Sequence, residues 1–303
     1  MRLLPPEEYE QVWPLVSSVE FATLSFTPVL RGVMEGRVFL STFSPKVSYI
    51  SNAYGMSLLC GASPAALPEE HLRSFTDWLR AHIFSRKRTY MEWLQAFPNN
   101  EWKEVFDKAF PSLLPTFDPE RTSHDSFALC ERINYRYNLE HSLPAASAAI
   151  PEGLVLSPLL LEHFPHLDGA VVPMHFWKGD TWATKGGTGF MLSVKSDDAA
   201  SSAGQPVSWS FSSGVTEKQL ELGIETVEAY RGKGLARLVC DRLLVYCAER
   251  GLDPIWCCRK SNVGSMRLAE ALGFQKIDYP FGPIHYYHLP AQEGGLSLDY
   301  RKL

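Results

Sequence analysis

The stretch that decides the fold reads Leu220-Glu-Leu-Gly-Ile-Glu-Thr-Val-Glu-Ala-Tyr-Arg-Gly-Lys-Gly-Leu-Ala236. Apolar side chains alternate with acidic ones and a glycine in its first half, which predicts a β-strand with one buried face. The residues that follow, 235–250, repeat apolar side chains at the spacing of one helix face. The sequence therefore predicts a strand that leads into a helix through the tight turn Arg231–Gly234.

This turn has the physical properties of an anion site. The first N–H groups of a helix lack internal partners, and the helix dipole adds about half a positive charge there. Gly232 and Gly234 let the backbone approach a ligand closely, while Arg231 and Lys233 add positive charge. A dinucleotide fingerprint would need a third glycine where Arg237 stands, and a Walker loop would continue with Gly-Lys-Ser/Thr. The sequence thus favours a phosphate site of another kind.

A second segment follows at a matching distance. Residues 253–258 read as a strand, and Ser261-Asn262 can cap a helix over 263–272 that ends at Gly273-Phe274. The two segments, Arg-x-x-Gly-x-Ala at 231–236 and Asn262 to Phe274, together resemble the acetyl-CoA motifs of the GNAT (Gcn5-related N-acetyltransferase) superfamily. The resemblance covers roughly residues 150–290. More narrowly, the chain is similar to a two-domain bacterial group that includes zwittermicin-resistance-type enzymes, which does not fix a substrate.

The resemblance implies an α+β fold for the whole chain. The GNAT domain, residues 150–290, is expected to be an α/β sandwich with a mixed, mostly antiparallel sheet flanked by helices. Residues 1–145 are expected to form an N-terminal α+β domain, which lacks a second Arg-x-x-Gly-x-Gly/Ala motif; whether it is a degenerate GNAT-like half stays open. The small, uncharged run Leu143–Pro151 suits a connection between the domains, and residues 291–303 suit a tail.

Periodicity places further elements along the chain. The sequence predicts helices over residues 6–17, 68–84, 101–110 and 157–164. It predicts strands over residues 37–43, 47–54, 55–60, 90–97, 189–194, 206–211, 277–279 and 284–289, and a mobile polar loop over 196–204.

The resemblance also implies which residues contact acetyl-CoA, the expected co-substrate. Val227 would offer backbone groups to the pantetheine arm, and Asn262 would contact that arm, with Ser265 one helical step further. Asn262 equally suits a helix cap, and both roles could hold at once. The diphosphate would be held by Arg231, Gly232, Lys233, Gly234, Leu235 and Ala236. Since contacts at this turn are mostly from the backbone in the family, the Arg231 and Lys233 side chains could instead extend into solvent.

An attacking amine has a pKa of about 10 and must lose a proton before it reacts. Glu221 and Glu225 are expected on one side of their strand, away from the apolar set, and we expect at least one of them to be the general base. Glu225, nearer the turn, is slightly favoured. The alternative is that both are solvated or paired with Arg259. Where many GNAT enzymes have a proton-donating tyrosine this chain has Ala269, so that another tyrosine (Tyr279 or Tyr286) or water would have to substitute.

Two other features have ordinary structural explanations. The pair His163-x-x-His166 has metal-like spacing but no accompanying ligands, so a capping or surface role is expected and no metal site. Trp209, on the strand before the motif, suits the core better than the acceptor site.

The expected function is N-acetyl transfer from acetyl-CoA to a primary amine of a small molecule, by direct attack in a ternary complex. The alternatives are a protein or peptide N-acetyltransferase, or an acetyl-CoA-binding sensor module without catalysis. The net charge of −5 argues against a nucleic-acid partner, and no apolar run is long enough to span a membrane. Six scattered cysteines and an N-terminus without a signal-peptide pattern favour the cytoplasm. A homodimer stays open.

Overall fold

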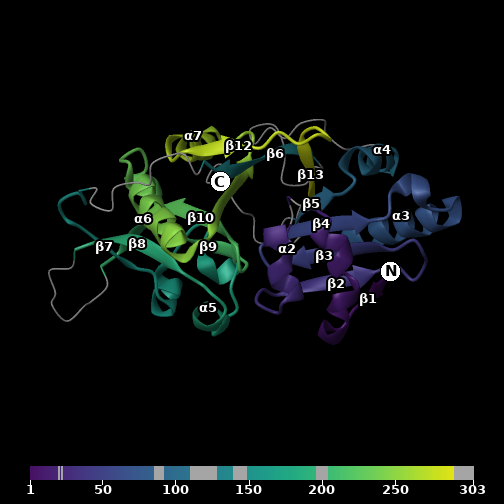
Figure 1. The fold of residues 1–303 in the computed structure, drawn as a ribbon, viewed down its shortest axis with the longest axis horizontal. Coiled ribbons are helices and arrows are strands. Elements are labelled where there is room, and N and C mark those ends of the chain that lie inside the picture. Colours follow the sequence, from purple (N-terminus) through teal and green to yellow (C-terminus); the bar gives the residue numbers. More distant parts are fainter. Residues whose placement is uncertain are drawn as a thin grey trace. The chain divides into compact units, whose positions relative to one another are not determined.

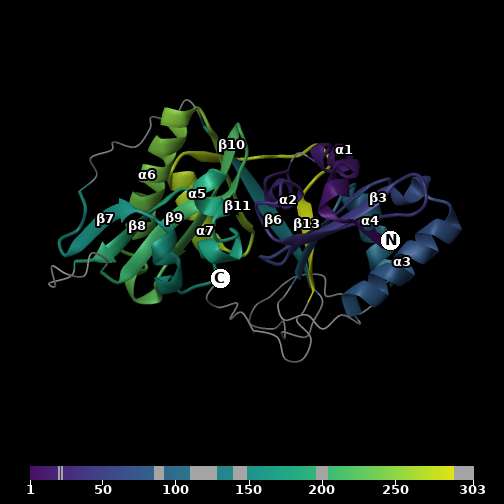
Figure 2. The same ribbon diagram turned by 90° about the horizontal axis from the view of Figure 1, so that it is seen from below.

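The computed structural model describes residues 1–19, 21, 23–84, 92–109, 128–138, 149–195 and 204–289. Three predicted features lie wholly or mostly outside these residues: the connection at 143–151, the polar loop at 196–204 and the tail at 291–303. The chain divides into two compact units. The first consists of residues 1–133, 259–261 and 278–303, and the second of residues 134–258 and 262–277 (Figures 1 and 2).

The first unit contains a mixed sheet. Its strands follow the order β1 (Arg2–Leu3), β2 (Gly36–Leu40), β3 (Val47–Asn52), β4 (Met56–Gly61), β5 (Glu92–Ala96), β13 (Ile284–Leu289) and the beginning of β6 (Ala128–Tyr137). Only β4 and β5 pair in parallel; the other neighbours are antiparallel.

Helices complete the first unit. The short segments η1 (Pro6–Gln11), α1 (Trp13–Ser17), α2 (Thr23–Leu30) and η3 (Pro64–Ala66) accompany two longer helices, α3 (Glu69–Phe84) and α4 (Asn99–Ala109). Phe75 of α3 and Trp102 of α4 are buried against Leu59 and Leu94 of the sheet. An amphipathic face on each of these helices thus covers the sheet, as their sequence periodicity predicts.

The second unit contains the sheet that carries the motif. Its strands follow the order β11 (Asp253–Arg259), β10 (Gln219–Thr226), β9 (Pro206–Val215), β8 (Gly189–Val194) and β7 (Leu154–Pro158). All neighbours are antiparallel except β10 and β11. The strand β12 (Phe274–Lys276) pairs antiparallel with residues 135–137 of β6. The predicted fold class, a mixed and mostly antiparallel sheet flanked by helices, is confirmed.

The helix α6 (Leu235–Arg250) begins and ends where the sequence predicts, and lies against β8, β9 and β10 (Figure 1). The second motif forms β11 and α7 (Val263–Ala271). The remaining helical segments are η4 (Leu161–His166), η5 (Pro173–His175), α5 (Thr181–Thr184) and η6 (Glu228–Tyr230). Trp209 is completely buried, as expected for a core residue. Within the described part of the chain, we find no helix with the length and apolar character needed to cross a bilayer.

Several local predictions are wrong. The helix expected over 157–164 is replaced by the end of β7, where Ser157 and Pro158 pair with β8, and by the short 3₁₀ segment η4. The closing strand expected over 277–279 lies three residues earlier, at β12. The opening helix over 6–17 divides into η1 and α1, since Pro14 has no N–H donor and favours the first turn of a new helix.

Candidate active site

The two central strands of the second unit separate along their length. Register between β10 and β11 runs only from Gln219–Asp253 to Glu221–Ile255, although β10 continues to Thr226 and β11 to Arg259. The pairing of β10 with β9 also shifts between Glu221 and Leu222, which is a β-bulge. Bulges increase local twist and are common beside active sites. Residues 222–226 therefore have no partner strand on the β11 side among the described strands, and their main-chain groups on that edge suit an extended ligand.

The turn after β10 ends at an uncapped helix. Gly232 and Gly234 have φ angles of 73° and 76°, a left-handed conformation that side chains with a Cβ disfavour. A Cβ at either glycine would meet nothing within 4 Å, so the glycines are required by the backbone angle and not by crowding. Gly234 is the N-cap of α6 and no side chain caps the helix. The start of α6, at Leu235 and Ala236, thus has the features of an anion site.

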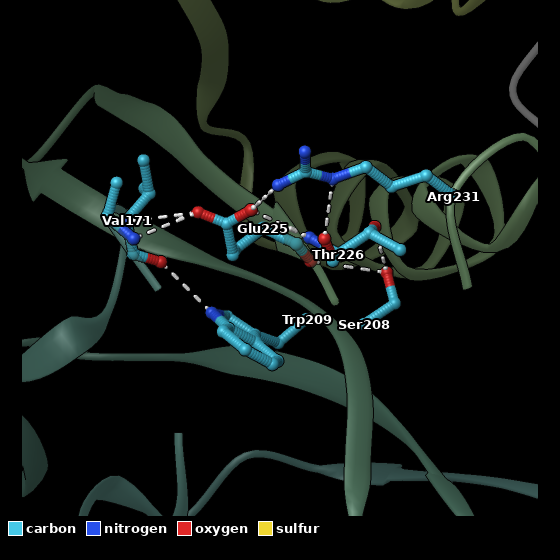
Figure 3. A network of polar contacts seen from close by, with 7 residues as sticks. Val171, Ser208, Trp209, Glu225, Thr226 and Arg231 are labelled. Atoms are coloured by element: carbon cyan, nitrogen blue, oxygen red, sulfur yellow. Dashed lines mark hydrogen bonds and ion pairs between the residues drawn. The ribbon is translucent and has the colours of Figure 1, made fainter. Parts of the chain in front are cut away.

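Arg231 is fastened to the end of β10. Its Nε donates a hydrogen bond to the Thr226 carbonyl at 3.0 Å, and its Nη2 lies 3.2 Å from Glu225 Oε1 (Figure 3). The Lys233 ammonium lies 4.9 Å from the Tyr230 ring centroid, a cation–π contact on an exposed side chain. Two cations therefore accompany the uncapped helix start, and one of them has a defined position.

The Glu225 carboxylate accepts four hydrogen bonds. Its Oε2 accepts from the backbone N–H groups of Ala170 at 3.1 Å and Val171 at 3.3 Å. Its Oε1 accepts from the Thr226 N–H at 3.2 Å and from Arg231. The residue is only 9% exposed. A general base needs a lone pair within reach of the substrate proton, so this arrangement favours a positioning role for Glu225. The cationic partner of Glu225 is Arg231.

Glu221 lies at the last paired position of β10, where β11 begins to separate. It is half-buried, and its Oε1 is contacted by the Cys257 thiol of β11. The Glu221 side chain therefore faces β11, the strand from which β10 separates. Glu221 is thus half-buried and lies beside the point where the two strands separate, whereas Glu225 is only 9% exposed.

The second motif residues form a helix cap. Asn262 Oδ1 accepts a hydrogen bond from the Ser265 N–H at 3.1 Å, so the capping role is present. Ser265 Oγ accepts from Trp256 Nε1 at 3.1 Å. Ala269 is completely buried in α7. These contacts fix the start of α7 beside β11, which holds both side chains in defined positions.

The two tyrosines considered as proton donors belong to the first unit and have aromatic partners there. Tyr279 stacks on Phe281 at a centroid distance of 5.0 Å, and Tyr286 meets the edge of Trp93 at 4.9 Å. Tyr286 is 3% exposed. Both rings thus contribute to packing in that unit.

His163 has a capping role. Its Nδ1 accepts a hydrogen bond from the Leu160 N–H at 2.9 Å. Across the described ranges, no three His, Cys, Asp or Glu side chains gather in a way that could hold a metal ion.

Segment 169–171 belongs to the surroundings of Glu225, although the sequence does not predict this. It contacts Glu225 and also Trp209, whose indole Nε1 donates to the Val171 carbonyl at 3.0 Å. No local pattern marks this segment, because its partners lie 38 and 55 positions further along the chain. The one available signal is Gly169, where a Cβ would lie 2.8 Å from Glu225 Cγ.

Comparison with known proteins gives a consistent result. A family model described as GNAT acetyltransferase matches residues 21–280. The uncharacterized N-acetyltransferase YdfB of Bacillus subtilis is 30% identical over 131 residues, which is 42% of this chain and 47% of that protein. The chain thus spans about half the length of that curated relative.

Two solved structures share the fold over nearly the whole chain. A GCN5-related N-acetyltransferase-like protein from Streptococcus suis has a TM-score of 0.61 at 19% identity, covering 93% of this chain and 98% of that one. A tandem GNAT protein from the clavulanic acid biosynthesis pathway has a TM-score of 0.55 at 13% identity, covering 98% of this chain and all of that one. The family match, unlike the sequence resemblance, extends well into the first unit. Because it includes most of the chain, the protein belongs to the GNAT acetyltransferase family, a family of acyltransferases.

Proposed function

We propose that the protein transfers an acetyl group from acetyl-CoA to the primary amine of a small molecule. The observation that carries this proposal is the separation of β10 from β11 directly before a turn with two left-handed glycines and an uncapped helix. The unpaired edge of β10 suits an extended arm with amide groups, and the helix start suits a diphosphate. A CoA thioester has both parts in one molecule.

The roles of the binding residues follow from this arrangement. Backbone groups of the turn and of Leu235 and Ala236 would hold the diphosphate, with Arg231 and Lys233 contributing positive charge. Val227 follows the unpaired edge of β10 and would offer its backbone to the pantetheine arm. Asn262 and Ser265, which are fixed at the start of α7, would contact the arm from the helix that follows β11.

We propose Glu221 as the proton acceptor. The ammonium form of the acceptor would give a proton to Glu221, and the neutral nitrogen would attack the acetyl carbonyl carbon. A C–N bond forms, the C–S bond breaks, and the second nitrogen proton is released as the amide forms. The departing thiolate then takes up one proton. A thiol of pKa about 8.5 is a fair leaving group, so the buried Ala269 is compatible with transfer.

A matched pair of variants tests this assignment. A panel of polyamines, amino acids, aminoglycosides and lysine peptides is incubated with acetyl-CoA, and thiol release is followed. For any amine that reacts, Glu221→Gln should lower kcat by about 10²–10⁴-fold and leave the acetyl-CoA dissociation constant unchanged. The control Glu249→Gln, at an exposed position of α6, should react like the native chain. Full activity of Glu221→Gln would contradict the assignment.

The competing function is a coenzyme-binding sensor that does not turn over, for which Ala269 at the family's tyrosine position is the supporting feature. Saturable acetyl-CoA binding without thiol release for any amine would favour that function. Release with lysine peptides alone would favour a protein or peptide acetyltransferase instead.

A further inference from the structure

Glu225 joins the coenzyme turn to a segment that lies about 55 positions earlier in the sequence. Its two carboxylate oxygens accept hydrogen bonds from different segments. Oε2 accepts from the backbone of segment 169–171, and Oε1 accepts from the Thr226 N–H at the end of β10 and from Arg231 in the turn (Figure 3). We propose that Glu225 is a positioning residue that couples the coenzyme turn to segment 169–171, so that acetyl-CoA binding orders this segment. The inference rests on the proposed coenzyme site and assigns a role that differs from general base.

The contact of segment 169–171 with the sheet is short and specific. Ala170 and Val171 donate their N–H groups to Glu225, while the Val171 carbonyl accepts from Trp209 Nε1 at 3.0 Å. Gly169 approaches so closely that an added Cβ would lie within 3.0 Å of the Glu225 side chain. Trp209 is fully buried and Ala170 is 7% exposed. The segment is therefore held by two side chains of the sheet, one of which also contacts the turn.

The contact on the turn side is equally direct. The guanidinium of Arg231 bridges Glu225 Oε1 and the Thr226 carbonyl. The Arg231 side chain is 42% exposed and that of Glu225 is 10% exposed, so the pair leads from the surface into the interior. A charge-assisted pair of this kind resists displacement more strongly than a neutral one.

A shared carboxylate gives these segments a physical reason to order together. Acetyl-CoA would fix the turn, including Arg231, and Arg231 would hold Glu225 in the orientation that accepts from Ala170 and Val171. Coupling between two sites is reciprocal, and its typical size is a 5- to 150-fold change in affinity. Any change that moves segment 169–171 away from Glu225 should thus weaken acetyl-CoA binding.

The test is amide hydrogen exchange of the full chain, measured at Ala170 and Val171 with and without saturating acetyl-CoA. Acetyl-CoA should slow exchange at both amides in the native chain by at least fivefold. In Arg231→Gln the coenzyme turn loses its ion pair with Glu225, so the slowing should be lost. Glu228→Gln removes one negative charge from an exposed position beside the turn and serves as the control. In this control the slowing should remain.

Kinetics distinguish positioning from proton transfer. If an amine substrate is found, Glu225→Gln should raise KM for acetyl-CoA and leave the acidic limb of the kcat/KM pH profile in place. The glutamine amide cannot act as a base, so a limb that persists in this variant comes from the ionisation of another group. Disappearance of that limb would overturn the inference. Gly169→Ala should also weaken acetyl-CoA binding, and should add nothing further when combined with Glu225→Gln.

The outcomes separate the two proposals. Absence of acetyl-CoA binding to the native chain would refute the proposed function itself. Normal binding without slower exchange at Ala170 and Val171, or slowing that persists in Arg231→Gln, would overturn the coupling alone. Arg231 is partly exposed, so its variant keeps the test valid even if Glu225→Gln does not fold.

Discussion

The sharpest perturbation of the coenzyme turn is Gly234→Ala. Gly234 has φ 76° and ψ 4°, and a Cβ there would meet no protein atom within 4 Å. Alanine in this left-handed conformation costs roughly 1–2 kcal/mol, and the open surroundings add no clash. We therefore expect a folded variant whose free energy of unfolding falls by that amount. Its Cβ would extend into the space beside the helix start, so acetyl-CoA affinity should fall at least about tenfold, equivalent to about 1.4 kcal/mol.

The same helix supplies the control. Gly251, the C-cap of α6, has φ 64° and ψ 32°, and a Cβ there also meets nothing within 4 Å. Gly251→Ala should show the same loss of stability with native acetyl-CoA affinity. Urea unfolding and calorimetric titration of acetyl-CoA measure the two quantities. Equal loss of affinity in both variants would show that backbone strain alone is responsible, and native affinity in Gly234→Ala would refute the diphosphate site at this turn.

Three further perturbations test separate parts of the structure. Asn262→Ala removes the cap of α7 and should lower the free energy of unfolding by about 0.5–2 kcal/mol. Asn262→Asp keeps the cap and therefore the native stability. Weaker acetyl-CoA binding in Asn262→Asp would reveal the coenzyme contact, and native affinity would exclude it. Burial raises the pKa of Glu92 to about 8, so the folded state holds its proton more tightly and stability declines as the pH rises from about 4.5 to 8. Glu92→Gln cannot ionise and should resist urea better than the native chain at pH 8.5, with the advantage gone below pH 4.5; a difference independent of pH would contradict this. Trp209→Phe keeps most of the packing but removes the hydrogen bond to the Val171 carbonyl. The free energy of unfolding in urea should fall by about 1 kcal/mol, and amide exchange in segment 169–171 should become faster. Unchanged exchange there would show that the indole does not hold the segment.

The parts of the fold that local chemistry determines were predictable. The helix α6 matches its predicted bounds because its buried face repeats at helical spacing and left-handed glycines precede and follow it. The strand β10 was equally visible from alternation. Segments that depend on distant partners were not: β12 lies where residues 135–137 pair with it, and no feature of residues 274–276 themselves fixes that position.

The candidate site shows the same division. The turn and the cap at Asn262 follow from local sequence. The different surroundings of Glu221 and Glu225 do not follow from it, because both residues fall on the same side of one regularly alternating strand. Segment 169–171 donates hydrogen bonds to the Glu225 carboxylate from about 55 positions earlier in the chain, so only the folded structure reveals that contact.

The most direct test of the central claim follows acetyl-CoA and the acceptor together. The native chain is incubated with acetyl-CoA and the amine panel, while thiol release and the mass of each amine are measured in the same sample. The account predicts at least one acetylated amine formed in equal amount to the released thiol, and a rate for both signals that is about 10²–10⁴-fold lower in Glu221→Gln. Saturable acetyl-CoA binding with no acetylated amine from any member of the panel would contradict the transfer reaction.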